Sequence, residues 1–203
     1  MDLISHSLFL SESLQSFKVT ASLFPSSRHL ASALLRPIDF ARCGRIVELG
    51  TGTGPVTSEI LRRMRPDAVL YAIDVNPAFV AHVSKKLSDH RLMPLVGRAE
   101  DLGKILDRLG VPKVDAIVSS LGLSVMEDPQ RRAIIGQASK CLQPYGLMSQ
   151  FQYLHAGGDP SWLRNVGLPH FSAEQFLKQY FRSVHTERVF RNLPPARVFI
   201  CRH

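Results

Sequence analysis

Residues 45–55 read Arg45-Ile46-Val47-Glu48-Leu49-Gly50-Thr51-Gly52-Thr53-Gly54-Pro55. The apolar residues at its start predict a short buried strand, and three glycines on alternate positions follow it. Glycine has no Cβ, so the backbone can turn sharply there and let a ligand lie directly on it. Pro55 suits the first turn of a helix, whose free N–H groups would face a carboxylate or a phosphate. The stretch therefore predicts a strand, a ligand-binding turn and a helix.

The spacing of the glycines separates two nucleotide cofactors that use such a unit. The dinucleotide fingerprint G-x-G-x-x-G needs its third glycine for close packing of helix on strand. Counted from Gly50 that position is Pro55, and counted from Gly52 it is Thr57, so the fingerprint does not fit. The pattern from Glu48 to Gly54, E-x-G-x-G-x-G, instead resembles the first motif of the Rossmann-like methyltransferases that use S-adenosylmethionine (SAM).

A second acidic residue supports a nucleoside ligand. The unbroken apolar run Val69-Leu70-Tyr71-Ala72-Ile73 is typical of a strand buried on both faces, and it ends at Asp74. A carboxylate at the end of the second strand can accept hydrogen bonds from ribose hydroxyls. Both NAD and SAM enzymes use that arrangement, so Asp74 does not choose between the two cofactors.

The remainder of the chain alternates strands with helices, which predicts βαβ units and a parallel sheet. Near the carboxyl end, two β-like runs joined at Asn192-Leu193-Pro194-Pro195 predict an antiparallel hairpin. The expected helices cover about 55–64, 77–89, 128–142 and 172–181, and the expected strands after the second cover 92–96, 114–120, 147–154, 183–190 and 196–201.

Composition suits one compact domain, since the chain has 203 residues of which 45% are hydrophobic. There are 25 Lys and Arg against 17 Asp and Glu, a net charge of +8, which favours nucleic acid or an acidic membrane surface as partner. The three cysteines are widely spaced, so neither a disulfide framework nor a zinc site is expected. No apolar run approaches the roughly 18–20 residues of a spanning helix, and no signal pattern opens the chain. We expect a cytoplasmic protein.

The first residues predict an amphipathic helix, because Leu3, Leu8 and Phe17 belong to a set of apolar residues at helical spacing. Such a segment can lie in a membrane interface or pack on the domain as a lid, and the residues leave both open. Ser26 or Ser27 can then cap a helix that runs through Leu35. The expected division is 1–24 as the amphipathic helix and 25–203 as the domain.

Taken with the glycine motif, five further stretches resemble the bacterial phospholipid N-methyltransferases over most of the chain. The Ser-Ser-Leu loop, the Gln-Phe-x-Tyr strand and the Asn-x-Pro-Pro-Ala hairpin point to this family rather than to SAM methyltransferases at large. The stretches are Pro25-Ser26-Ser27-Arg28-His29-Leu30-Ala31, Gly97-Arg98-Ala99-Glu100-Asp101, Asp115-Ala116-Ile117-Val118-Ser119-Ser120-Leu121, Gln150-Phe151-Gln152-Tyr153 and Asn192-Leu193-Pro194-Pro195-Ala196.

The resemblance implies an α/β, Rossmann-like class I fold: a mostly parallel seven-stranded sheet with helices on both faces and the hairpin at its end. It implies methyl transfer from SAM to the amine of phosphatidylethanolamine, towards phosphatidylcholine, with S-adenosylhomocysteine as the other product and no metal. The enzyme would sit peripherally on the inner face of the cell membrane. Arg98 stands where the family commonly has an acid for the adenine amine, so that role would fall to Ala99 with Glu100 or Asp101. Gly122 replaces the more usual proline.

The site residues follow from the motifs. Tyr153 and His155, past the fifth strand, could accept the proton that the amine must lose, although rim packing and a surface histidine are open alternatives. Tyr153 could also hold a methylated amine by cation–π attraction, with Arg191 and Asn192 beside it on the substrate. The expected cofactor-binding residues are Ser26, Ser27, Glu48, Gly50, Thr51, Gly52, Gly54, Asp74, Val75, Ala99, Glu100, Ser119, Ser120 and Leu121.

Two other functions compete with lipid methylation. An adenine N6-methyltransferase of ribosomal RNA would suit the basic charge. Such enzymes carry an Asn-x-Pro-Tyr-type motif after the fourth strand, whereas this chain has Ser119-Ser120-Leu121-Gly122 there. A non-catalytic, membrane-binding module would not need the intact glycine loop. We therefore expect a phospholipid substrate and an anionic membrane surface as partners, and no nucleic acid.

Overall fold

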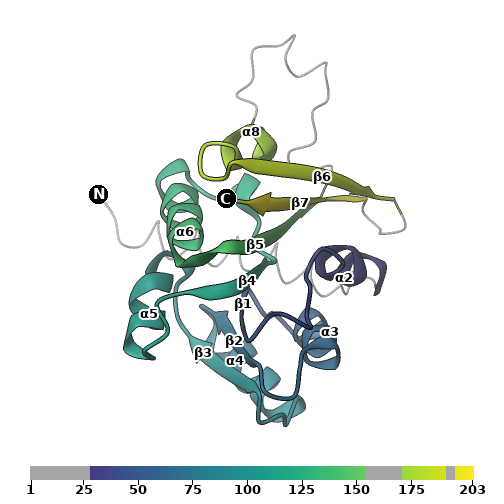
Figure 1. Ribbon diagram of the computed structural model, residues 1–203, viewed down its shortest axis with the longest axis vertical. Coiled ribbons are helices and arrows are strands. Elements are labelled where there is room, and N and C mark those ends of the chain that lie inside the picture. Colours follow the sequence, from purple (N-terminus) through teal and green to yellow (C-terminus); the bar gives the residue numbers. More distant parts are fainter. Residues whose placement is uncertain (1–27, 154–170, 191–194) are drawn as a thin grey trace.

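The computed structural model describes residues 28–153, 171–190 and 195–203. Its strands form one seven-stranded sheet in the order β3-β2-β1-β4-β5-β7-β6 (Figure 1). Strands β1 to β5 run parallel to one another, and β7 runs antiparallel between β5 and β6. The predicted fold class is confirmed. The strands are β1 (Arg45–Leu49), β2 (Val69–Asp74), β3 (Leu92–Val96), β4 (Val114–Ser119), β5 (Leu142–Tyr153), β6 (Ser183–Val189) and β7 (Ala196–Arg202).

Helices cover both faces of the sheet, which is why the central strands read as apolar runs. Helices α2 and α3 pack on the face that includes Ile46 of β1, while α5, α6 and α8 pack on the face that includes Val47 and Leu49. The helical elements are α2 (Arg28–Leu35), α3 (Pro55–Arg63), α4 (Pro77–Lys86), η1 (Ala99–Asp101), α5 (Leu102–Arg108), η2 (Leu123–Val125), α6 (Asp128–Cys141) and α8 (Ala173–Leu177).

The three largest differences between the observed and the expected elements are at α5, β5 and α8, while α4 ends at Lys86 rather than at 89. Helix α5 was not anticipated, because it has seven residues and contains Gly103, and glycine weakens a helix. Strand β5 begins at Leu142, directly after α6, rather than at 147. Helix α8 covers Ala173–Leu177 instead of 172–181. The predicted segment 1–24 lies outside the described residues, so its helix and the domain boundary stay predictions. No helix of the described ranges is both long and apolar enough for a membrane span.

Arg91 joins the edge strand β3 to the end of α3. Its guanidinium donates to the backbone carbonyls of Leu61 and Met64, both at 2.9 Å, and of Arg65 at 3.3 Å. It also donates to the Asp89 carboxylate at 2.7 Å, and this pairing lowers the pKa of Asp89 to about 2. The last carbonyls of a helix lack partners within the helix. At the end of α3, Arg91 supplies the hydrogen-bond donors for these carbonyls.

Replacing Arg91 by alanine is expected to lower the free energy of unfolding by about 2–4 kcal/mol, because the carbonyls and Asp89 lose their donor. Urea denaturation measures the loss. Arg62→Ala is the control, since the Arg62 side chain is 68% exposed and its ion pair with Glu59 lies on the surface. Its removal should cost less than about 1 kcal/mol. Equal losses in the two variants would contradict the role assigned to Arg91.

Candidate active site

The glycine loop after β1 has the backbone conformation that only glycine adopts easily. Gly50, Gly52 and Gly54 have φ angles of 83°, 52° and 85°, in the left-handed region that side chains disfavour. A Cβ added at Gly50 would lie 3.0 Å from Leu121 Cδ2, whereas one added at Gly52 would have nothing within 4 Å. The loop thus offers bare backbone to open space at the carboxyl edge of the sheet.

Asp74 ties this loop to the end of β2. Its Oδ2 accepts hydrogen bonds from the Gly52 N–H at 3.0 Å and from the Thr51 hydroxyl at 3.3 Å. Its Oδ1 accepts from the Asn76 N–H at 2.9 Å. Each carboxylate oxygen can accept more than one hydrogen bond. The loop therefore orients Asp74 and leaves it able to receive hydroxyl donors from a ligand.

Glu48 lies on β1 just before the glycine loop and is completely buried. Among the residues that the structure describes, no donor reaches either carboxylate oxygen with ordinary hydrogen-bond geometry. Burial raises the pKa of Glu48 to about 8; nearby Thr57 counters part of the rise, and the charge of Asp74 adds to it. A buried carboxylate of this kind is costly, and a cationic ligand would favour its ionised form.

The loop after β4 forms the wall beside the glycine loop. The Ser120 N–H donates to the Leu49 carbonyl at 2.9 Å, and the Leu121 side chain reaches Gly50. The Ser120 hydroxyl is buried and has no partner in the described part of the chain. From β5, the Gln150 amide donates to the Leu121 carbonyl at 2.7 Å. Gln150 was part of a quoted motif but was not predicted as a site residue, and its contact with the loop is visible only in the structure.

The turn after β3 brings Glu100 to the same edge. Glu100 Oε1 accepts from Arg98 at 2.7 Å and from Gln130 of α6 at 3.0 Å. Lys104 donates to Asp101 at 2.8 Å, and this hydrogen bond lowers the pKa of Asp101. Arg98, the residue that departs from the family pattern, thus orients Glu100. The adenine contact of Glu100 or Asp101 stays a prediction.

Tyr153 ends β5 at this edge, two strands away from β1. Its ring packs edge-on against Phe151, with 5.3 Å between the ring centroids. Burial raises the pKa of the Tyr153 phenol, so the phenol keeps its proton at neutral pH. Tyr153 can therefore act through its neutral hydroxyl or its ring face, whereas a phenolate base is disfavoured.

Most of the predicted site residues meet along the carboxyl edge of β3, β2, β1 and β4, where parallel strands place their loops together. Five lie outside the described residues and stay predictions: Ser26, Ser27, His155, Arg191 and Asn192. Those at the edge are Glu48, Gly50, Thr51, Gly52, Gly54, Asp74, Val75, Ala99, Glu100, Ser119, Ser120 and Leu121.

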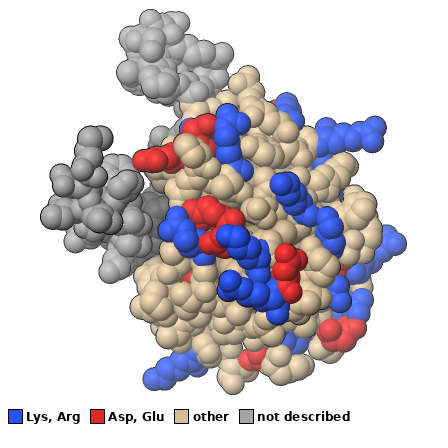
Figure 2. Space-filling model, turned by 90° about the vertical axis from the view of Figure 1, so that its left-hand side faces the viewer, with Lys and Arg blue, Asp and Glu red and all other residues tan. Residues whose placement is uncertain are grey.

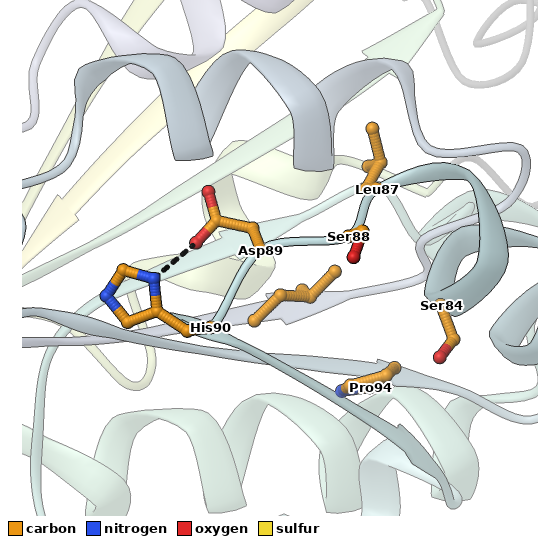
Figure 3. A pocket seen from close by; sticks show the side chains of 7 residues that line it. Ser84, Leu87, Ser88, Asp89, His90 and Pro94 are labelled. Carbon is orange, nitrogen blue, oxygen red and sulfur yellow. Dashed lines mark ion pairs between the residues drawn. The ribbon is translucent and has the colours of Figure 1, made fainter.

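A surface hollow of about 360 Å³ lies elsewhere, between the end of α4 and the start of β3 (Figure 3). His90 points to Asp89 there, with 3.9 Å between His90 Nδ1 and Asp89 Oδ1. The Asp89 carboxylate, however, already accepts hydrogen bonds from Arg91. None of the predicted site residues line it. The lining residues are Ser84, Leu87, Ser88, Asp89, His90, Leu92 and Pro94.

The positive charge is not gathered into one patch on the face shown in Figure 2, where Lys and Arg alternate with Asp and Glu. Several of the basic side chains form ion pairs, for example Arg132 with Asp128 and Lys104 with Asp101. Within 28–153, 171–190 and 195–203, no group of three or more His, Cys, Asp or Glu could hold a metal ion.

Known methyltransferases resemble this chain in sequence and in fold. A family model described as a methyltransferase domain matches residues 46–146. An ornithine lipid N-methyltransferase from Singulisphaera acidiphila is 28% identical over 196 residues, covering 96% of this chain and 94% of that protein. A ribosomal RNA small subunit methyltransferase H from Desulfosudis oleivorans is 32% identical over 104 residues, covering 49% of this chain and 33% of that protein. The structure of the O-methyltransferase TomG from Streptomyces achromogenes, in complex with SAM, matches with a TM-score of 0.61 at 18% identity, covering 86% of this chain and 79% of that chain.

Proposed function

Since residues 46–146 form a class I methyltransferase domain that uses SAM as donor, we propose that the chain methylates the amine of a membrane lipid headgroup. One observation carries the proposal: the likeness to the ornithine lipid N-methyltransferase covers 96% of this chain and so extends well beyond the domain. The likeness to the ribosomal RNA enzyme covers 49%. The candidate substrates are phosphatidylethanolamine, which the sequence motifs predict, and an ornithine lipid, which the name of the Singulisphaera acidiphila relative indicates.

The residues at the carboxyl edge fit SAM. When bound, SAM supplies a methyl group activated by its sulfonium. The bare backbone at Gly52 can approach the ligand closely, Asp74 can accept hydrogen bonds from ribose hydroxyls, and the buried Glu48 suits a cationic donor. The loop after β4 would close the side that faces the acceptor.

The acceptor amine must be neutral and in line with the methyl group. A dry pocket lowers the pKa of an ammonium group and so favours its neutral form. Tyr153 would contribute its neutral hydroxyl as a hydrogen-bond partner and its ring as a surface for the cationic methylated amine, worth about 0.5–2 kcal/mol. His155 is the proposed route for the proton to solvent.

Labelled SAM tests the proposal when it is offered with four acceptors in parallel. These are liposomes with phosphatidylethanolamine, liposomes with an ornithine lipid, small ribosomal subunits, and buffer alone. Label in either lipid supports the proposal and names the headgroup. Label in ribosomal RNA alone would show that the nucleic-acid alternative is correct. SAM binding without transfer to any acceptor would favour a non-catalytic module.

We further propose that the enzyme works as a peripheral protein on the cytoplasmic face of the membrane, docked through residues 1–24. The burial of each Leu or Phe side chain in lipid contributes roughly 1.5–3 kcal/mol, and each basic residue near an anionic leaflet about 1 kcal/mol. A few side chains of the segment suffice for reversible attachment.

Deletion of residues 1–20 is therefore expected to abolish co-sedimentation with anionic liposomes and to leave SAM binding measurable. Co-sedimentation and calorimetry with SAM check the two halves. A second variant of full length replaces Leu8 and Phe9 by serine, which removes apolar surface without shortening the chain. Liposome binding by the truncated protein at the level of the full chain would refute the docking role.

A further inference from the structure

The antiparallel strands place two arginines together near the acceptor side. Tyr153 of β5 lies opposite Ala196 of β7, which forms the last pair of these strands at the carboxyl edge. One residue further into the sheet, Gln152 lies opposite Arg197, and Arg197 lies opposite Arg188 of β6. Side chains of directly opposed residues project from the same face of a sheet. Arg188 and Arg197 are therefore neighbours on the face of the sheet that also carries Phe199 and Cys201. Arg188 is exposed there and Arg197 is half-buried.

This pairing is unfavourable for the fold alone, because like charges directly opposite each other destabilise a sheet. Some other arginines have carboxylate partners, such as Arg91 with Asp89 and Arg132 with Asp128. Neither Arg188 nor Arg197 forms an ion pair with any residue of the described ranges. The Nε of Arg197 is buried and has no hydrogen-bond partner there.

The acid whose pKa Arg197 influences, Glu174, is already engaged. Glu174 of α8 accepts from Lys178 at 2.6 Å and from the Thr186 hydroxyl at 3.0 Å. Its pKa is lowered mainly by Lys178 and Thr186 and least by Arg197. Two cationic side chains thus remain without a full counter-charge, one residue away from the carboxyl end of β5. Tyr153, at that end, projects from the opposite face of the sheet together with Phe151.

We propose that Arg188 and Arg197 form an anion subsite that holds the acidic group of the lipid headgroup while its amine reaches the edge near Tyr153. The inference rests on the proposed function and deepens it. A guanidinium offers parallel N–H donors that match a phosphate or a carboxylate. Phosphatidylethanolamine carries a phosphate and an ornithine lipid a carboxylate, each a short carbon chain away from the amine. The favoured substrate class is therefore a lipid whose headgroup bears both charges.

The test compares two double variants with equal changes of charge. One carries Arg188→Gln and Arg197→Gln. The control carries Arg182→Gln and Arg202→Gln, which lie next to and at the other ends of the same two strands. Both are prepared as the full chain with S-adenosylhomocysteine, and their melting temperatures are measured with inorganic phosphate, glycerophosphoethanolamine and Nα-acetylornithine. A ligand that binds only the folded protein raises this temperature.

We expect the wild type and the control to be stabilised by phosphate and glycerophosphoethanolamine, and the Arg188/Arg197 variant by neither. Without ligand, the Arg188/Arg197 variant should melt no lower than the wild type, because the like-charge pair has been removed. Its KM for the lipid should rise at least tenfold while its Kd for SAM is unchanged. The response to Nα-acetylornithine tells whether a carboxylate replaces the phosphate.

Stabilisation of the Arg188/Arg197 variant equal to that of the control, or no stabilisation of any protein, would overturn the subsite. A KM for the lipid equal to that of the wild type in the Arg188/Arg197 variant would also overturn the subsite. The proposed function would still hold if the wild type methylates lipid. The opposite result is also informative. If phosphate binding requires Arg188 and Arg197 but the wild type methylates no lipid, the anion site is supported and the proposed function is wrong.

Discussion

Replacing Asp74 by alanine is expected to lower the affinity for SAM at least 100-fold. The Asp74 carboxylate accepts hydrogen bonds from the Gly52 N–H and the Thr51 hydroxyl. Its loss therefore releases the loop on which the cofactor would lie. It also removes the acceptor for the ribose hydroxyls. Hydrogen bonds to charged groups contribute about 1.5–3 kcal/mol each, and two of them account for roughly two to four powers of ten in affinity.

Calorimetry with SAM and with S-adenosylhomocysteine measures this loss, and unfolding curves show whether the variant is folded. Asp67→Ala is the matched control, because the Asp67 side chain is 66% exposed and pairs with Arg65 on the surface. Its affinity for SAM should equal that of the wild type. If Asp74→Ala bound SAM within threefold of the wild type, the assignment of the cofactor to this edge of the sheet would be wrong.

The sequence predicts this edge well because its signals are local. Glycines on alternate positions, a buried strand before them and an acid after the second strand each depend on a few neighbouring residues. Glu48, Gly50 and Asp74 accordingly lie where the motif puts them. Helix α5 escaped prediction for the same reason: seven residues with an internal glycine carry no local helical signal, and only the parallel pairing of β3 and β4 with the central strands demands a crossover at this point.

The contacts between distant segments could not be predicted. The opposition of Arg188 and Arg197 depends on the register of β6 against β7, because a shift of β6 by one residue would move Arg188 to the face opposite Arg197. The bond from Gln150 to the Leu121 carbonyl depends equally on the pairing of β4 with β5. Arg98 looked like a departure from the family pattern, yet in the fold it and Gln130 hold Glu100. The sequence therefore identifies residues with suitable functional groups, but not the residues that they contact in the fold.

The environment of Glu48 is another property that the sequence did not reveal, since its motif only marks the residue as acidic. In the folded chain its carboxyl has a pKa of about 8, whereas the ordinary value is 4.5. Below pH 4.5 the group is protonated in both the folded and the unfolded chain. Between 4.5 and 8 the unfolded chain has lost the proton and the folded chain still holds it. The free energy of unfolding should therefore fall as the pH rises through this window, by up to about 1.4 kcal/mol per pH unit.

Glu48→Gln is expected to remove this decline, because an amide is neutral at every pH, and to leave the protein more stable than the wild type near pH 8. Urea denaturation at intervals between pH 5 and pH 8 measures the difference. The acids with lowered pKa values, such as Glu59 and Asp89 at about 2, lose their stabilising effect only at lower pH and do not interfere. Parallel curves for the two proteins would show that Glu48 is ionised in the folded chain. Bound SAM should flatten the wild-type curve, because its positive charge favours the carboxylate, and the Glu48→Gln curve should keep its slope when SAM is added.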